Sequence, residues 1–237
     1  MSPTVPWSRH RRAQATLGRL AQSSDDPVLT AYGQAGLPAL ETPAGELRLL
    51  ALDLETTGLD PRRDQVLSVG FVPIDGRRIV LSGATQLHVR PTTGAGVGQS
   101  ARIHGLTDDM LATGCAAREA LDVVLTALTG RVLLAHYAVV ETGFLGVLAR
   151  AAYGREVPMR VIDTLEIGRS MLPPERRAQP PRNALRLWKL RQRFGLPSYA
   201  AHDAFLDALA CAELYLAQLA EIESDARRPV TLRRLVR

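Results

Sequence analysis

Two carboxylates spaced two residues apart, Asp53 and Glu55, follow directly on the apolar run at residues 49–52. An apolar run bounded by turn residues predicts a strand that is buried on both faces. Side chains two apart on a strand point the same way, so we expect both carboxylates side by side in the core. Buried anions this close are costly unless a cation neutralises them, so the pattern predicts a divalent metal site. The alternative is an edge-strand pair that faces water.

A further carboxylate, Asp207, lies in a segment whose apolar residues cover most of the expected helix surface. A helix that is apolar nearly all round is buried, so Asp207 also requires a counter-charge. His202 precedes the expected helix start at Asp203, where its side chain is free to reach the same site. The alternatives are a plain surface acid at Asp207 and an ordinary loop or capping histidine at His202.

Three motifs follow one another along the chain: Asp-x-Glu-Thr-x-Gly from Asp53, Ile-His-Gly-Leu-Thr from Ile103, and His-x-x-x-x-Asp from His202. In this order they resemble the DEDDh (DnaQ-like) 3′–5′ exonuclease family, which includes the epsilon proofreading subunit of bacterial replicative polymerase. The resemblance covers roughly residues 47–222. It implies two Mg²⁺ or Mn²⁺ ions held by four acids, with a histidine as general base.

The chain departs from this family at the third acid. The family places an aspartate in the helix after the fourth strand, following an Ala-His-Asn-like stretch. Here the matching acid is Glu141, and Tyr137 stands at the Asn position. Glutamate keeps the charge and binds metals, but paired ions demand a separation of ~3.5–4 Å, so a longer arm can shift their occupancy. We expect catalysis to survive, and the alternative is that Glu141 is a solvated helix residue.

The resemblance implies a role for each matching residue. Asp53, Glu141 and Asp207 would hold the ion that activates water, and Asp53 would be the main ligand of the second ion. Glu55 would support the first ion and orient the water. His202 would take the proton of the water, since the near-neutral pKa of imidazole suits that role.

The resemblance also implies residues that contact substrate or support the site. The residues expected near the terminal nucleotide are Thr56, Thr57, Leu59 and His104. A turn-stabilising role is the alternative for His104. We expect His136 to pack near the end of its strand rather than bind metal, and Asp163 to have a structural role beside the site.

The order of expected elements is that of a ribonuclease H-like α/β fold. A meander of three strands comes first, and Asp75-Gly76 predicts a tight hairpin turn within it. Helices and strands then alternate, which predicts a mixed five-stranded sheet flanked by helices. Strands are expected over residues 47–55, 66–74, 78–90, 131–136 and 159–163, and helices over 117–128, 140–153, 183–194 and 203–222.

The chain is expected to have three parts. Residues 1–46 form an N-terminal extension, with a basic amphipathic helix over about 7–22 and a mostly irregular connector after it. Residues 47–223 form the exonuclease domain, and residues 224–237 form a basic C-terminal tail.

Composition limits the environment of the protein. No apolar stretch approaches the ~18 residues that a membrane span needs, and no apolar block follows the arginines at Arg9, Arg11 and Arg12 to suggest a secretory signal. Cys115 and Cys211 lie in helix-like, Ala-rich segments and are expected to be core residues in a reducing compartment. We therefore expect a cytoplasmic bacterial protein. The net charge of +5 suits a polyanionic partner, although compositional bias explains it equally well.

The leading hypothesis is a 3′–5′ exonuclease that hydrolyses DNA to nucleoside 5′-monophosphates in proofreading, repair or turnover. Its expected partners are single-stranded or 3′-ended nucleic acid and a separate polymerase subunit. One alternative is an exoribonuclease on short RNA, because the acids do not discriminate between sugars. The other is a domain that binds nucleic acid or a partner and has lost turnover because of Glu141.

Overall fold

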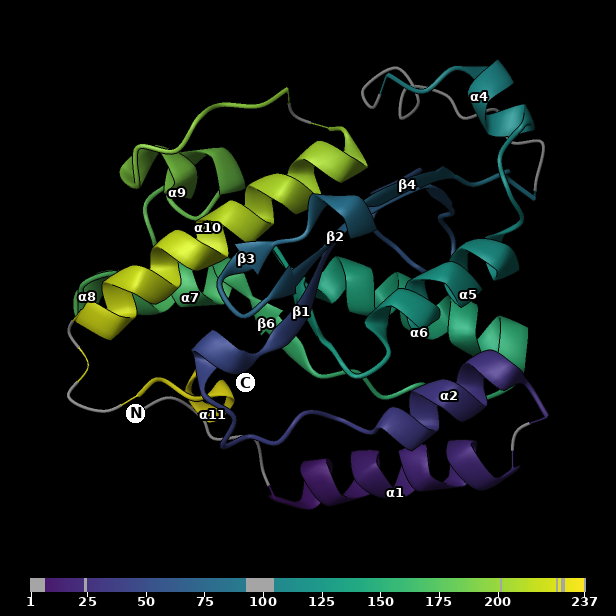
Figure 1. Cartoon of the computed structure of the whole chain (residues 1–237). Coiled ribbons are helices and arrows are strands. Elements are labelled where there is room, and N and C mark those ends of the chain that lie inside the picture. Colours follow the sequence, from purple (N-terminus) through teal and green to yellow (C-terminus); the bar gives the residue numbers. More distant parts are fainter. Residues whose placement is uncertain are drawn as a thin grey trace.

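The computed structural model describes residues 7–23, 25–92, 105–200, 202–224, 226 and 229–236 (Figure 1). At its centre is a mixed six-stranded sheet in the order β3-β2-β1-β5-β6, with β4 also pairing with β2. The strands are β1 (Arg48–Thr56), β2 (Val66–Asp75), β3 (Arg78–Ile79), β4 (Thr85–His88), β5 (Val132–Ala135) and β6 (Val161–Asp163).

The pairing confirms the predicted mixed sheet. β1 is antiparallel to β2 and parallel to β5, and β5 is parallel to β6. The predicted third strand at 78–90 is interrupted by the 3-10 turn Leu81–Gly83, so both β3 and β4 pair with β2. The sheet therefore has six strands rather than the five expected.

Helices cover both faces of this sheet. They are α1 (Trp7–Ser23), α2 (Pro27–Ala35), α4 (Asp108–Ala112), α5 (Ala117–Leu128), α6 (Val139–Tyr153), α7 (Thr164–Ser170), α8 (Pro174–Arg177), α9 (Leu187–Arg193), α10 (Ala204–Ser224) and α11 (Leu232–Leu235). α10 crosses one face along β1 and β2, and α5 and α6 cover the other (Figure 1). Among the helices described, none is long and apolar enough to cross a membrane.

The alternation of side chains along β1 decides which helix its acids meet. Leu50 and Leu52 are buried in the core that includes α5 and α6. Leu49 and Ala51 are buried in the other core, with Cys211 and its neighbours on α10. Because residues two apart share a face, the odd-numbered positions of β1 point toward α10.

The first turn of α10 touches the sheet at Gly70 on β2. A Cβ atom added at Gly70 would lie 2.1 Å from the carbonyl carbon of Ala204 and 2.2 Å from the nitrogen of Phe205. Gly70 is also the register partner of Asp53 on β1. The missing side chain therefore brings the start of α10 directly over the strand pair that carries the acids.

The connector after α1 is more regular than predicted. Residues 27–35 form α2, because Asp26 accepts hydrogen bonds from the backbone N–H of Val28 and Leu29 and Pro27 occupies the first turn. Gly33 does not break this helix. A Cβ atom there would lie 2.6 Å from the nitrogen of Ala21, so the glycine is the contact point between α1 and α2.

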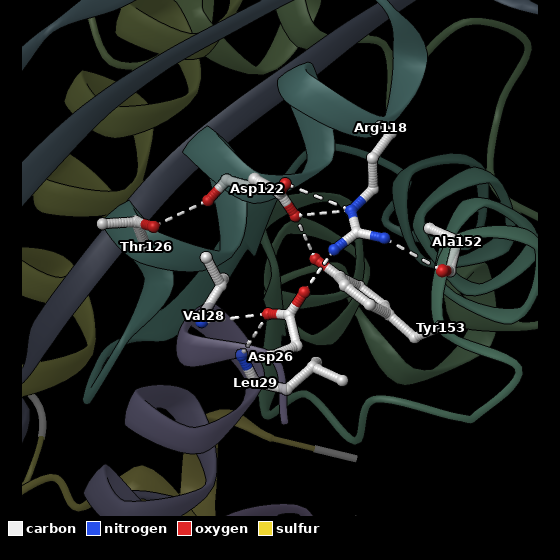
Figure 2. A network of polar contacts seen from close by, with 8 residues as sticks. All are labelled: Asp26, Val28, Leu29, Arg118, Asp122, Thr126, Ala152 and Tyr153. Atoms are coloured by element: carbon white, nitrogen blue, oxygen red, sulfur yellow. Dashed lines mark hydrogen bonds and ion pairs between the residues drawn. The ribbon is translucent and has the colours of Figure 1, made fainter. Parts of the chain in front are cut away.

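A polar network fastens α2 to the helices on the same face of the sheet (Figure 2). Arg118 on α5 donates to Asp26 and to Asp122, and its guanidinium lies 4.1 Å from the ring centroid of Tyr153. Tyr153, at the end of α6, donates its hydroxyl to Asp122. The N-terminal helices thus share a core with the sheet and polar contacts with α5, although the division at residue 46 stays a prediction.

The described C-terminal residues also pack inward. Val230, Leu232, Leu235 and Val236 are buried in the core on the α10 face, and Val236 forms a β-bridge to Ile162. Part of the stretch expected as a basic tail therefore packs on the domain, and the division of the chain at residue 224 stays a prediction. Its apolar residues cover the sheet while the arginines between them lie at the surface.

Smaller differences occur at helix starts. The helix expected over 183–194 begins at Leu187, after a turn in which Asn183 has a φ of 62°. The Pro- and Arg-rich loop after α7 contains the short helix α8. α6 lies within one residue of its predicted start.

Candidate active site

The carboxylates of β1 lie on the inner face of the sheet, under α10. β1 is flanked by β2 and β5, so the edge-strand alternative for Asp53 and Glu55 is wrong. Glu55 is 5% exposed and Asp53 is half-buried. Both acids therefore lie in an environment that penalises an uncompensated charge.

The start of α10 brings two more groups to the same place. The backbone N–H of His202 donates to the Asp207 carboxylate at 2.9 Å, and His202 has a φ of 68°. This turn folds the histidine back over the first turn of α10. One potential ligand atom from each of Glu55, His202 and Asp207 lies within 4.8 Å of the others, which is a spacing that suits a metal ion.

Glu141 reaches the cluster from the first turn of α6. It is 3% exposed, so the alternative of a solvated helix residue is wrong. Its Oε2 atom is buried and has no hydrogen-bond partner among the described residues. Burial raises the pKa of the Glu141 carboxyl to about 8; a backbone hydrogen bond lowers it and the charge of Asp163 raises it further. A buried carboxylate oxygen without a donor fits a cation ligand.

The charges of the cluster act on one another. Burial raises the pKa of Asp53 well above its ordinary value, and the charges of Glu141, Asp207, Glu55 and Asp203 add to the shift in that order. Burial followed by Asp207 and Asp203 raises the pKa of Glu55 to about 7. Burial is also the largest cause of the raised pKa of Asp207. Such a site lacks positive charge, and divalent cations would supply it.

Asp203 is a member of the cluster that the sequence analysis did not assign. Its Oδ1 accepts from the backbone N–H of Leu206 at 2.9 Å, and its Oδ2 accepts from Gln86 Nε2 at 3.3 Å. The carboxylate thus caps α10 and also contributes charge to the site. The sequence indicated Asp203 only by its position between His202 and the helix, and that position predicts a helix cap as readily as a site residue.

The turn that delivers Glu141 is held by Asp163. Asp163 Oδ1 accepts from the backbone N–H of Tyr137 at 2.9 Å, and Oδ2 accepts from that of Ala138 at 3.0 Å. Tyr137 has a φ of 70°, which is rare for a residue with a side chain. Asp163 also caps α7 through Leu165. Its predicted structural role beside the site is therefore consistent with its contacts.

His136 lines the site without being available to a metal. Nδ1 lies 2.8 Å from Thr164 Oγ1, and Nε2 lies 2.9 Å from the carbonyl oxygen of Leu185. Burial lowers the pKa of His136 to about 4. Both ring nitrogens are engaged, which agrees with the predicted packing role.

The loop after β1 is ordered by its own hydroxyl groups. Thr56 Oγ1 donates to the carbonyl of Gly58 at 2.6 Å, and Thr57 Oγ1 bonds the Asp64 carboxylate at 3.1 Å. Leu59, at the tip of the loop, is 75% exposed. The loop therefore offers backbone and an apolar side chain to solvent, whereas His104 lies outside the described residues.

A cavity of about 330 Å³ opens beside the acids. Asp53, Asp207 and His202 lie on one wall. Residues of α9 and the loop that follows it also line the cavity, among them Trp188 and Tyr199. The acid cluster is thus accessible to a ligand from solvent.

A mixed sheet that gathers acids from a central strand and two helices defines a class of metal-dependent nucleases. The RNase_T family model, described as exonuclease, matches residues 50–215, and the chain belongs to this family. The predicted DEDDh (DnaQ-like) assignment, the exonuclease class and the ribonuclease H-like fold are confirmed.

The relatives include polymerase-associated proteins. The chain is 30% identical over 170 residues to the DNA polymerase III subunit epsilon of Treponema pallidum, covering 72% of this chain and 75% of that protein. It is 30% identical over 175 residues to the PolC-type DNA polymerase III of Thermotoga maritima, covering 73% of this chain but only 12% of that protein. The chain therefore spans about an eighth of the PolC-type polymerase that it matches.

The solved structures that resemble this chain share its fold. Exonuclease I of E. coli in complex with a dT13 oligonucleotide has a TM-score of 0.61 at 16% identity, covering 75% of this chain and 43% of that chain. The nuclease domain of 3′hExo, a DEDDh family member bound to rAMP, also has a TM-score of 0.61, at 15% identity, covering 73% and 92%.

Proposed function

We propose that this chain is a 3′–5′ exonuclease that hydrolyses DNA to nucleoside 5′-monophosphates, in proofreading, repair or turnover. The observation that carries the proposal is the convergence of acids from β1, α6 and α10 on Asp53, which lines a cavity together with Asp207 and His202. DNA is favoured over RNA because the relatives that match at the sequence level include DNA polymerase III proteins. Their names also favour a separate polymerase subunit as partner and the bacterial cytoplasm as location.

The acids are the proposed ligands of two Mg²⁺ or Mn²⁺ ions. Asp53, Glu141 and Asp207 would hold one ion, Asp53 would be the main ligand of the other, and Glu55 would support the first. The donor set fits, because Glu141 Oε2 is buried without a partner among the described residues and oxygen ligands suit these hard cations. When bound, the ions would promote formation of the nucleophile and stabilise the leaving 3′ oxygen.

His202 is the proposed general base. It is exposed at the mouth of the cavity, and its nitrogen lies within reach of the Glu55 and Asp207 carboxylates. A water molecule placed by Glu55 would lose its proton to this imidazole as it attacks the phosphorus atom. The backbone around Thr56, Thr57 and the exposed Leu59 would hold the terminal nucleotide, and His104 is proposed to lie near it.

The test is a digestion of matched DNA and RNA strands that carry a 5′ label, with Mn²⁺, with Mg²⁺ and with EDTA. We expect a ladder of shortened DNA with either ion and no ladder with EDTA. An Asp207→Asn control should give no ladder with either ion. Immediate release of the labelled 5′ nucleotide would overturn the polarity. Faster shortening of RNA would favour the exoribonuclease, and binding without shortening would favour the domain that has lost turnover.

A further inference from the structure

The wall of the cavity that comes from α9 and the following loop carries large aromatic side chains at the surface. Trp188 on α9 is 60% exposed and Tyr199 in the following loop is 36% exposed. Both line the same cavity as Asp53, Asp207 and His202. Packing does not explain the exposure of Trp188, because most of its surface is not covered by the fold.

Hydrogen bonds of Arg191 and Tyr199 connect this wall to α10, the helix that carries Asp207. Arg191 is buried and donates to the carbonyl oxygens of Ala210 and Pro197 and to the Glu213 carboxylate, each at 2.7 Å. Tyr199 donates its hydroxyl to Glu213 at 2.9 Å, and the Arg191 guanidinium lies 4.8 Å from the Tyr199 ring centroid. These contacts tie α9 and Tyr199 to α10, beside which α9 lies in Figure 1.

Positive charge accompanies the rings. Arg186 lines the cavity and is exposed, and Lys189 Nζ lies 5.6 Å from the Trp188 ring centroid. Lys189 donates to the neutral Gln192 side chain at 2.8 Å. Within the described part of the chain, neither cation forms an ion pair with a carboxylate. Aromatic rings interleaved with cations are the combination that binds unpaired bases and their phosphates.

We propose that Trp188 and Tyr199 form a stacking platform for unpaired bases that precede the terminal nucleotide, with Arg186 and Lys189 contacting the phosphates between them. The proposal rests on the proposed function, and it specifies single-stranded polynucleotide as the substrate class. A base that is paired and stacked in a duplex does not offer a free face to a ring. The platform therefore selects a single-stranded or melted 3′ end.

The expected size of the effect follows from stacking energies. Loss of one aromatic ring from a single-strand site costs about 1–3 kcal/mol per base, which corresponds to roughly 5- to 150-fold in affinity. We expect Trp188→Ala to raise KM for a dT12 strand within that range and to leave kcat nearly unchanged. Trp188→Phe should restore most of the affinity, because a ring remains at the position.

A small substrate distinguishes the effect of the platform from that of the catalytic centre. The p-nitrophenyl ester of thymidine 5′-monophosphate has no preceding nucleotide, so Trp188→Ala should hydrolyse it within about twofold of the parent rate. Leu81→Ala is the matched control, because Leu81 is 61% exposed and is not part of the cavity wall. It should leave both substrates unaffected. Thermal melting of each variant checks that the fold is intact.

The outcomes are distinct from those of the proposed function. If Trp188→Ala slows the ester and the strand equally, the residue supports the site and the platform is wrong. If it slows neither, the platform is also wrong. Should the parent hydrolyse neither substrate, the proposed function fails. Fluorescence anisotropy of labelled dT12 still tests the platform in that case. Equal affinity of the parent and Trp188→Ala for the strand would refute the platform, and weaker binding by the variant would support it.

Discussion

The sharpest perturbation of this site is Glu141→Gln, which removes an ionisable carboxyl group at nearly constant shape. In the metal-free protein the Glu141 carboxyl has its pKa raised from 4.5 to about 8, chiefly by burial. At neutral pH it is therefore protonated when folded and ionised when unfolded. A glutamine resembles the protonated form, so the substitution should cost little in packing and should remove the penalty of keeping an acid neutral.

The magnitude follows from linkage. A group whose folded pKa is raised contributes stability below its unfolded pKa and loses it as the pH rises through the folded value. At pH 7 the penalty for Glu141 is about 3 kcal/mol, at roughly 1.4 kcal/mol per unit between 4.5 and 7. We expect metal-free Glu141→Gln to be about 1–3 kcal/mol more stable than the parent at pH 7, and equal to it below pH 4.5.

Metal should reduce this difference. An ion that binds only the folded state at 100 times its Kd adds about 2.7 kcal/mol of stability. The parent should gain this with Mn²⁺, and the variant, which lacks one anionic ligand, should gain less. Exonuclease activity should fall in Glu141→Gln by about as much as on loss of Asp207.

The assay is chemical denaturation of both proteins at pH 4.5 and pH 7, with EDTA and with Mn²⁺, beside a digestion of labelled DNA. Thr142→Ser is a control from the same helical turn, because it keeps the hydroxyl that bonds the Ala138 carbonyl at 2.7 Å. Equal metal-free stability of parent and Glu141→Gln at pH 7, together with untouched Mn²⁺-dependent activity, would refute the assignment of Glu141 as third acid.

Four other perturbations test the rest of the site. Asp53→Ala or Asp207→Ala should remove nearly all turnover and leave the fold intact, and retention of more than about a tenth of parent activity would contradict the two-ion assignment. His202→Ala should slow hydrolysis ~10²–10⁴-fold with metal affinity unchanged by calorimetry; loss of a metal site would make it a ligand instead. Stability of the metal-free protein should fall from pH 5 to pH 8, because the folded pKa of Glu55 is raised to about 7, and excess Mg²⁺ should flatten this slope in a denaturation series. Gly70→Ala should lower the melting temperature and the activity together, because a Cβ there would lie 2.1 Å from the α10 backbone; a fully active, equally stable variant would show that the helix start is not fixed by this contact.

The acids of β1 were predictable from the sequence because their evidence is local. A buried strand and the period of two place Asp53 and Glu55 on one face without any knowledge of the partner elements. The burial of Glu55 and the central place of β1 agree with that expectation. The metal-ligand roles of both residues remain predictions.

Elements that depend on contacts far along the chain were harder to predict. α2 was missed because Gly33 and Gly36 look like helix breakers, whereas Gly33 is required by the close approach of α1. The described C-terminal residues were read as a basic tail because their arginines dominate the composition. Their apolar residues have a partner only once Ile162 and the α10 face are in place.

The site as a whole depends on backbone turns and hydrogen bonds that no single sequence motif contains. Glu141 is delivered by a turn in which Tyr137 has a φ of 70° and Asp163 accepts its N–H. His202 is delivered by a second positive φ, of 68°, and a hydrogen bond to Asp207. Backbone of this kind costs about 1–3 kcal/mol at each position and persists only where surrounding contacts hold it. Two such positions flank one acid cluster, so part of the stability of the fold is spent on aiming these side chains. Asp163 accepts from the backbone N–H groups of Tyr137 and Ala138 just before α6, so the turn that positions Glu141 is held by a residue from another strand.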